Sequence, residues 1–266
     1  MSLPPSLFFD LAEWGHQPLF DEQRPVWQAL AALKAYMDDH PYQNCFTSLA
    51  ARGPLAQAMV LHNELLFDAA GCTIDFGDAT KGKLRVSRAG VVLDGASILM
   101  AGAVLVGTRF HFGRGVVVES GAFLKEPAII GDQSEVRQGA YLRGYCLVGQ
   151  RCVVGHATEV KHSLLLDDAK AGHFAYLGDS ILGNHVNLGA GTKLANLRFQ
   201  SGEVEVKTPG GPQKTGLKKL GAILGDRCQT GCNSVTNPGA LLGKKCVLLP
   251  TTTAPSGHHP AGTLIR

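Results

Sequence analysis

The stretch that decides the fold is Met100–Leu166, MAGAVLVGTRFHFGRGVVVESGAFLKEPAIIGDQSEVRQGAYLRGYCLVGQRCVVGHATEVKHSLLL. A large apolar residue recurs at every sixth position along it, and a small or β-branched residue stands four positions later in much of the stretch. The apolar series is Met100, Val106, Phe112, Val118, Leu124, Ile130, Val136, Leu142, Val148, Val154, Val160 and Leu166. The small series is Ala122, Ala128, Ser134, Ala140, Cys146, Cys152 and Thr158.

A six-residue period of this kind is typical of a β-helix solenoid. Three short strands make one triangular coil, in which one large side chain per strand fills the interior and a smaller one fits near the corner. A set of ordinary buried strands would not keep one phase over so many repeats. The sequence therefore predicts a mainly β protein, a left-handed parallel β-helix built from hexapeptide repeats.

The period returns towards the C-terminus with the same spacing. The large positions are Leu224, Thr230, Thr236, Leu242 and Leu248, and the small ones are Cys228, Ser234, Ala240, Cys246 and Thr252. Five-residue slips interrupt the pattern on the way through Ala171, Leu177, Leu182 and Leu188. An excursion with Pro209 at its tip covers about residues 197–220. We expect the β-helix to span residues 88–253 and a C-terminal tail, residues 254–266, to be irregular.

Residues 1–87 lack the six-residue period and are expected to form a small mixed α/β cap. Proline at a helix start and apolar residues at helical spacing predict a helix over Pro25–Asp39. A weaker helical run covers Pro54–His62, and Leu65–Val86 looks extended. The end of a solenoid needs such a cover because its last coil exposes apolar side chains and unpaired strand edges.

Composition excludes several classes of protein. The net charge of +3 and the lack of a basic run argue against a nucleic-acid partner. No apolar segment predicts a signal peptide or a membrane span. The seven cysteines are an odd number without a disulfide spacing, which indicates free thiols and a cytoplasmic location.

Three cations stand eighteen residues apart, one full coil, at Lys125, Arg143 and Lys161. Each follows a large apolar position, so all three should stack on one face about 5 Å apart. Stacked cations repel one another, so the column either binds a shared anion such as a phosphate or is neutralised by carboxylates such as Glu126 and Glu159.

Histidines gather just after this column, at His156, His162 and His173. With the slip in register, His173 should lie one coil above His156. Tyr176, Asn187 and Asn196 follow within about the next coil, where the periodicity breaks, and local rules tend to fail at functional sites. A lone outward histidine is usually only a surface residue. The spacing does not suit a zinc site, and no hydrolase, P-loop or dinucleotide motif is present. No metal is therefore expected.

Three segments of the chain resemble known families. Residues 173–192 read HFAYLGDSILGNHVNLGAGT, which is similar to the acetyltransferase domain of the bifunctional enzyme of UDP-N-acetylglucosamine synthesis. Residues 195–199, ANLRF, and 229–239, QTGCNSVTNPG, resemble more closely the β-helical halves of sugar-1-phosphate nucleotidylyltransferases. The hexapeptide repeat is shared by many acyltransferases. Two motifs are more specific: His-x-x-Tyr-x-Gly-Asp at residues 173–179 and Asn-x-Gly-Ala-Gly-Thr at residues 187–192.

The resemblance implies acetyl transfer from acetyl-CoA to the amine of an amino-sugar phosphate or nucleotide-sugar. His173 matches the general base, and Asn196 matches the asparagine near the reacting amine and acetyl group. The residues that match contacts to the sugar phosphate are Arg143, Lys161, Tyr176 and Asn187, with Lys125 added from the cation column. Ala190 matches the residue whose backbone N–H approaches the acetyl carbonyl, and Cys232 matches another coenzyme contact.

The family is further expected to form homotrimers with sites between subunits. Residues 1–87 are too short for a nucleotidylyltransferase domain, so that activity is not expected. Gly202 and Glu205 stand near the place where the family has a functional lysine, and the nearest lysine is Lys207. Two alternatives therefore stay open: a longer-chain acyltransferase acting on a UDP-sugar, and a catalytically silent β-helical binding or scaffold protein.

Overall fold

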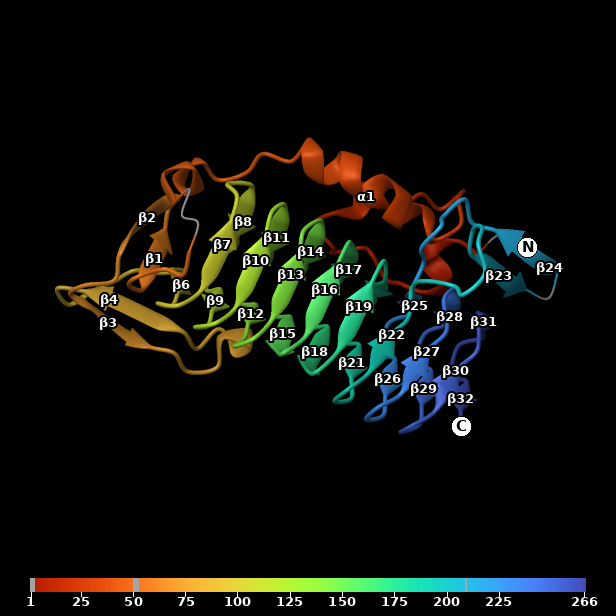
Figure 1. Cartoon of the computed structure of the whole chain (residues 1–266). Coiled ribbons are helices and arrows are strands. Elements are labelled where there is room, and N and C mark those ends of the chain that lie inside the picture. The colour runs from red at the N-terminus through yellow and green to blue at the C-terminus, as the bar shows by residue number, and fades with distance from the viewer. Residues whose placement is uncertain (1–2, 50–52, 209) are drawn as a thin grey trace.

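The structure is a computed structural model that describes residues 3–49, 53–208 and 210–266. It is mainly β, and its body is a left-handed parallel β-helix with three faces, as the hexapeptide period predicts (Figure 1). Each coil contributes one short strand to each face in turn. Strands of successive coils therefore stack in parallel along the axis of the helix.

We name the three sheets by their outer surfaces. The extended face carries two antiparallel strands, β1 and β2, at its first end and then runs in parallel to the last coil. Its strands are β1 (Met59–His62), β2 (Leu65–Asp68), β6 (Ser97–Leu99), β9 (Val117–Val118), β12 (Glu135–Val136), β15 (Val153–His156), β18 (Lys170–His173), β21 (Asn187–Leu188), β26 (Gln229–Thr230), β29 (Val247–Leu248) and β32 (Leu264–Ile265).

The other two sheets are the charged face and the covered face. The charged face consists of β7 (Val104–Val106), β10 (Phe123–Lys125), β13 (Tyr141–Arg143), β16 (Glu159–Lys161), β19 (Tyr176–Gly178), β22 (Lys193–Leu194), β27 (Val235–Thr236) and β30 (Thr253–Ala254). The covered face consists of β8 (Phe110–Phe112), β11 (Ala128–Ile130), β14 (Cys146–Val148), β17 (Ser163–Leu165), β20 (Ile181–Leu182), β25 (Ala222–Leu224), β28 (Ala240–Leu242) and β31 (Gly257–His259).

The interior follows the predicted period except in the first coil and at one slip. Leu99 and Leu105 pair with Val118 and Leu124 and fill the interior, so the prediction that Met100 and Val106 do so is wrong by one position. The coil takes an extra residue after Leu105. There the Glu126 carboxylate accepts hydrogen bonds from the backbone N–H groups of residues 108 and 109, at 2.6 and 2.7 Å.

The first five-residue slip comes one repeat earlier than predicted. Leu165 pairs with Val148 and with Leu182 inside the prism, whereas Leu166 is buried against the outside of the β-helix. The two residues are both leucine, so the sequence alone does not tell which one points inward. The small inward positions behave as predicted: Cys146, Cys152, Cys228 and Cys246 are buried as free thiols.

Residues 3–49, which we call the strap, run along the outside of the covered face. The strap contains the 3₁₀ turns η1 (Pro5–Leu7), η2 (Gln17–Leu19) and η3 (Asn44–Leu49) and the helix α1 (Gln28–Asp38), which confirms the predicted helix. Figure 1 shows α1 lying over the strands of the covered face, and the strap begins near the last coils. The sequence did not predict this course along the side of the solenoid.

Hydrogen bonds tie both ends of the strap to the β-helix. Asp226 accepts from the backbone N–H of Asp10 at 2.7 Å, near the last coils. At the other end Gln43 exchanges two hydrogen bonds with the backbone of Phe112, each 3.0 Å long. Between these ends the apolar side chains of the strap are buried together with outward residues of the covered face, Ile129, Leu147, Leu164, Ile181, Ile223 and Leu241.

The first end of the prism is closed by Phe46 and Leu55, which join the interior core. The ring of Phe46 lies 5.8 and 5.3 Å from those of Phe110 and Phe112. The predicted helical run over Pro54–His62 is wrong, because Met59–His62 is strand β1, which pairs with β2 and β6. The extended stretch that follows is confirmed. It ends in a small antiparallel sheet of β3 (Cys72–Asp75), β4 (Arg85–Arg88) and β5 (Val91–Val92), with the turn η4 (Ala79–Lys81).

The excursion after Asn196 is present and contains the hairpin β23 (Glu205–Thr208) and β24 (Gly211–Lys214). Its predicted tip residue, Pro209, lies outside the described residues. The hairpin packs on its own chain, where a side chain at Gly257 would meet Lys207 of β23. The prediction of an irregular C-terminal tail is wrong, because residues 253–265 add β30, β31 and β32 to the three faces. None of the described helices has the length and hydropathy needed to cross a bilayer.

Candidate functional site

The cation column lies on the charged face, as the period predicts. Lys125 pairs with Arg143 in the parallel register, and Lys161 pairs with Gly178 of the next coil. Two of these cations have carboxylate partners. Arg143 Nη1 lies 2.7 Å from Glu159 Oε1, and Lys161 Nζ lies 3.1 Å from Asp179 Oδ2.

Lys125 is the exception in this column. Its Nζ lies 5.6 Å from the centre of the Tyr141 ring, and the guanidinium of Arg143 lies 6.0 Å from the same ring. No carboxylate partner is recorded for Lys125 in the described part of the chain. The column is thus largely neutralised locally, and an anion that binds here has to compete with Glu159 for Arg143.

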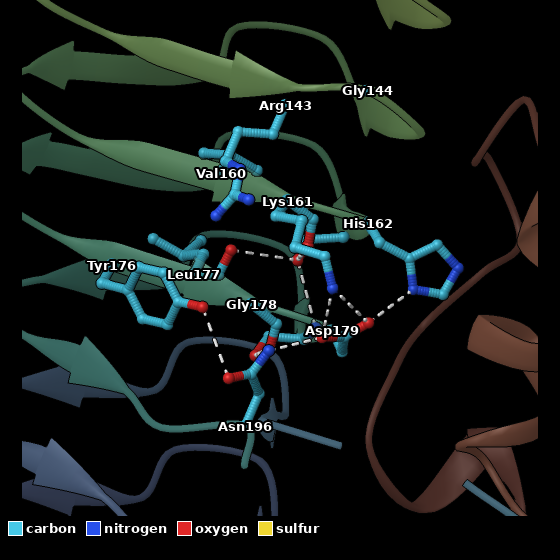
Figure 2. Close-up of polar contacts among 12 residues, drawn as sticks. Arg143, Gly144, Val160, Lys161, His162, Tyr176, Leu177, Gly178, Asp179 and Asn196 are labelled. Atoms are coloured by element: carbon cyan, nitrogen blue, oxygen red, sulfur yellow. Dashed lines mark hydrogen bonds and ion pairs between the residues drawn. The ribbon is translucent and has the colours of Figure 1, made fainter. Parts of the chain in front are cut away.

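Asp179 is the centre of the polar contacts at the corner between the charged and covered faces (Figure 2). Its Oδ1 lies 2.9 Å from His162 Nδ1, and its Oδ2 accepts from Lys161 Nζ at 3.1 Å and from Asn196 Nδ2 at 2.5 Å. Burial alone would raise the pKa of Asp179, but the hydrogen bonds from His162, Asn196 and Lys161 outweigh it and lower the pKa. The carboxylate is therefore held ionised.

Local backbone geometry explains why this corner can gather so many groups. Asp179 has φ 48°, a left-handed conformation that aspartate tolerates better than most residues. Gly178, just before it, has no room for a side chain, because a Cβ there would lie 2.5 Å from Asn196 Nδ2 and 2.6 Å from Tyr176 Oη. Tyr176 in turn donates to Asn196 Oδ1 at 3.3 Å. The glycine lets the phenol and the amide meet over the strand end.

The corner between the extended and charged faces carries a second group of predicted residues. His173 ends β18 and stacks on His156 one coil away, with ring centres 5.6 Å apart and 20° between planes, which confirms their predicted neighbourhood. Backbone hydrogen bonds continue this corner from coil to coil. Gly191 N donates to His173 O at 3.0 Å, and Asn233 N donates to Ala190 O at 2.8 Å.

His173, Ala190 and Cys232 therefore lie along one edge of the prism, which we call the histidine corner. The side chains of His173 and Cys232 are exposed, and Phe174, beside them, is 63% exposed. Among the described residues, the backbone N–H of Ala190 donates to no acceptor. This amide is free to approach a carbonyl group.

The predicted residues thus fall into two groups within one chain. Arg143, Lys161, Tyr176 and Asn196 come together at the strand ends of the charged face, whereas His173, Ala190 and Cys232 share the histidine corner. Asn187 lies apart from both, at the start of β21 on the extended face, paired with Lys170. A full strand of the charged face, β19, separates His173 from Asp179.

Sequence reasoning missed Asp179 and overlooked His162 as its partner. Two signals could have identified Asp179 from the sequence. It is the last residue of the segment HFAYLGD, and it follows a charged-face strand directly, as His162 does one coil earlier. Lys161 and Asn196 lie seventeen or eighteen residues from Asp179 in sequence, so the three-way contact depends on the five-residue slips. No group of three or more His, Cys, Asp or Glu side chains in the described ranges could hold a metal ion.

Comparisons with known proteins identify the kinds of protein that this chain resembles. The family model of the GMPPB C-terminal domain matches residues 124–209. A bifunctional sugar-1-phosphate nucleotidylyltransferase/acetyltransferase of Sulfurisphaera tokodaii is 38% identical over 151 residues, which cover 50% of this chain and 38% of that protein. The resemblance noted in the sequence is confirmed. This chain is similar to the bifunctional sugar-1-phosphate nucleotidylyltransferase/acetyltransferases over part of its length.

Two further relatives are proteins named bifunctional protein GlmU. The one from Methanocaldococcus jannaschii is 37% identical over 107 residues, covering 40% of this chain and 26% of the relative. The one from Synechococcus elongatus is 32% identical over 146 residues, covering 55% of this chain and 28% of the relative. The chain thus spans well under half the length of the curated relatives it matches.

Among solved structures, the acetyltransferase domain of PglB from Neisseria gonorrhoeae in complex with acetyl coenzyme A is similar to this chain over part of its length. The TM-score is 0.26 at 13% sequence identity, covering 63% of this chain and 54% of that one.

Proposed function

We propose that this protein is an acetyltransferase that moves an acetyl group from acetyl-CoA to the amine of an amino-sugar phosphate or nucleotide-sugar. The observation that carries the proposal is that the two groups of site residues lie on adjoining parts of the β-helix. His173, Ala190 and Cys232 follow one another on the histidine corner, and Arg143 and Lys161 stand on the adjoining charged face. The names of the relatives, which include acetyltransferase and sugar-1-phosphate, support the same chemistry.

The reaction needs a base and a stabilised oxyanion. An amino-sugar amine is largely protonated near neutral pH, and only its free electron pair attacks the thioester carbonyl of acetyl-CoA. His173 is exposed on the histidine corner and takes the proton that leaves the amine, because a neutral imidazole nitrogen can act as a general base. The free N–H of Ala190, one coil away, donates to the oxyanion of the tetrahedral intermediate before coenzyme A leaves as the thiol.

The two groups of site residues come together in a homotrimer under this proposal. Three bulky apolar side chains near the groups are strongly exposed in the single chain: Phe174 and Leu197 at 63% and Phe199 at 111%. Exposed apolar patches of this kind mark interaction sites. Light scattering at micromolar concentration tests the assembly, and a monomer would contradict both the trimer and a site shared between subunits.

The remaining parts of the proposal concern the reaction's limits and location. No metal takes part, uridylyl or thymidylyl transfer is not expected from this chain, and the buried thiols of Cys146, Cys152, Cys228 and Cys246 are compatible with the cytoplasm. Incubation with a sugar 1-phosphate and a labelled nucleoside triphosphate tests the second point directly. Formation of a nucleotide-sugar would contradict it.

The central experiment measures thiol released from acetyl-CoA with a panel of amino-sugar phosphates and UDP-amino-sugars. Replacing His173 by asparagine should keep the assembly and the coenzyme affinity but lower turnover by about 10²–10⁴-fold, the usual contribution of a general base. Raising the pH should partly restore the variant, because it deprotonates the free amine. His156→Asn is the matched control, since it removes the stacked ring one coil away and should change turnover far less.

Three outcomes separate the alternatives. Turnover of His173→Asn at the parental rate places the base elsewhere. Activity only with longer acyl-CoA donors on a UDP-sugar favours the longer-chain acyltransferase, and a parent chain that does not bind coenzyme A favours the scaffold.

A further inference from the structure

The Asp179 carboxylate contacts three side chains from the two coils that flank its own. Lys161 and His162 come from the coil before it, and Asn196 comes from the coil after it (Figure 2). The side chain of Asp179 is 9% exposed, against 26% for Lys161 and 42% for Arg143. The buried carboxylate therefore lies beneath the groups that face the solvent.

Contacts of this kind restrict flexible side chains. A lysine has a four-carbon stem and loses much rotamer freedom when its ammonium is fixed, so a free Lys161 would sample many positions. The 3.1 Å contact to Asp179 Oδ2 selects one of them, with Nζ at the strand end on the carboxylate oxygen that Asn196 Nδ2 also contacts. The same oxygen accepts from the amide nitrogen of Asn196, which leaves the amide oxygen to the phenol of Tyr176.

The backbone at this corner makes the arrangement rigid. Asp179 N donates to Lys161 O at 3.0 Å, and Gly221 N donates to Asp179 O at 2.8 Å. Leu220 N donates to Asn196 O at 3.2 Å, so the end of the excursion is tied to the same corner. Both the carboxylate and the residues that it contacts are thus anchored from the coils on either side.

We propose that Asp179 is a positioning residue that fixes Lys161 and Asn196 for the anionic sugar substrate. This inference rests on the proposed function for the identity of that substrate. Asp179 itself lies too deep to contact an anion and would repel it, so its effect passes through Lys161 and Asn196. When a phosphate group binds Lys161, the ammonium is already held at the strand end. Less side-chain entropy is therefore lost on binding.

The test measures binding of glucosamine 1-phosphate by isothermal titration calorimetry, alongside thiol release from acetyl-CoA. Asp179→Asn keeps the size of the side chain but removes its charge and one acceptor. We expect the Kd for glucosamine 1-phosphate to rise roughly tenfold, as for a lost hydrogen bond to a charged group, while the affinity for coenzyme A stays the same.

A double-mutant cycle distinguishes positioning from a general loss of structure. If Asp179 acts through Lys161, then Asp179→Asn should add little to the weakening that Lys161→Met already causes, because contacting residues are not additive. Asp168→Asn is the matched control. Asp168 is another corner aspartate with φ 60°, held 2.9 Å from Arg151 Nη2, but it lies at the corner between the covered and extended faces.

The outcomes separate this inference from the proposed function. A Kd for Asp179→Asn within twofold of the parent value, or fully additive effects with Lys161→Met, would overturn the inference and leave the acetyltransferase proposal standing. If the parent binds the sugar phosphate and the variants weaken it, but no thiol is released, the inference holds and the proposed function fails. If the parent neither binds nor reacts, both fail. Circular dichroism of each variant shows whether the β-helix is intact.

Discussion

The covered face and the charged face line the same prism, yet their outer surfaces are opposite in character. Outward positions on the covered face are apolar, as at Leu147 and Ile181, and the strap buries them. Outward positions on the charged face carry Lys125, Arg143 and Lys161, and no segment of the described chain lies over them in Figure 1. The inward-facing repeat is the same on both faces and does not determine the character of their outer surfaces. The outward residues between the repeat positions determine whether a face is apolar or charged.

The difference has a physical cause in each case. Burying an apolar outer surface under the strap stabilises the fold by the hydrophobic effect, at about 25 cal/mol per Å². Leaving cations exposed on the charged face contributes little to stability, since surface ion pairs are worth about 0–1 kcal/mol. A surface that is not needed for folding is free to bind a ligand, and the candidate site lies there.

Trp27 should show the largest effect, because this residue of the strap is only 2% exposed and is buried with the outward residues of the covered face. Trp27→Ala should lower the free energy of unfolding by about 3–5 kcal/mol, the usual cost of removing a large buried aromatic side chain. Urea denaturation measures it. Leu65→Ala, at a leucine that is 68% exposed, is the control and should cost little. An equal loss for both variants would mean that the strap is no better packed than the surface.

Arg143 tests the charged face. Arg143→Ala removes a cation matched to the sugar phosphate and releases Glu159, whose carboxylate is then unpaired beside the substrate. The KM for the sugar phosphate should rise roughly ten- to a hundredfold, for a charged hydrogen bond worth about 1.5–3 kcal/mol. Steady-state kinetics at saturating acetyl-CoA provide the measurement. An unchanged KM would mean that the column is only a solvated ridge.

A fall in pH should weaken the packing of the strap on the covered face. Burial, followed by the nearby His40 and His111, lowers the pKa of His16 to about 4, and His16 Nδ1 lies 2.7 Å from the hydroxyl of Tyr36 in α1. The unfolded histidine titrates near 6.5. Below pH 6.5, His16 binds a proton in the unfolded chain but stays neutral in the folded chain until the pH approaches about 4. The stability contributed by the neutral ring is therefore complete above pH 6.5 and is lost as the pH falls towards about 4.

The free energy of unfolding that His16 contributes and that is lost on acidification should be on the order of 1–2 kcal/mol, after allowing for its partial exposure. Both tryptophans of the chain, Trp14 and Trp27, belong to the strap, so intrinsic fluorescence reports its detachment directly. His16→Gln should flatten the stability profile between pH 6.5 and 4. A profile identical to that of the parent would exclude His16 as the titrating group.

Lys125 should show the smallest effect. Its ammonium lies over Tyr141 without a carboxylate partner in the described chain, and a cation–π contact at an exposed site is worth about 0.5–1 kcal/mol. Lys125→Ala should therefore lower the free energy of unfolding by less than about 1 kcal/mol. It should also raise the KM for the sugar phosphate by a smaller factor than Arg143→Ala does. A larger effect than that of Arg143→Ala would move the anion site one coil towards the N-terminus.

The repeat made the β-helix predictable from the sequence because each inward position faces the same environment in every coil. Leu124, Leu142 and Val160 stack in one column for that reason, and so do the cations that follow them. The family motif then selected His173 and its companions. Where the repeat was ambiguous, as between Leu165 and Leu166, two equal side chains offered no basis for choice, and packing on both sides decided the register.

The sequence by itself determined the solenoid, the stacking of the cations and the histidines, and the resemblance to bifunctional sugar-1-phosphate nucleotidylyltransferase/acetyltransferases. These features depend on local period and on short motifs. Only the tertiary structure decided that the strap lies along the covered face, that residues 253–265 complete another coil, and that Asp179 joins Lys161, His162 and Asn196. Such contacts join positions far apart in the chain, and their register is set by the sum of all the slips between them, which no local pattern records.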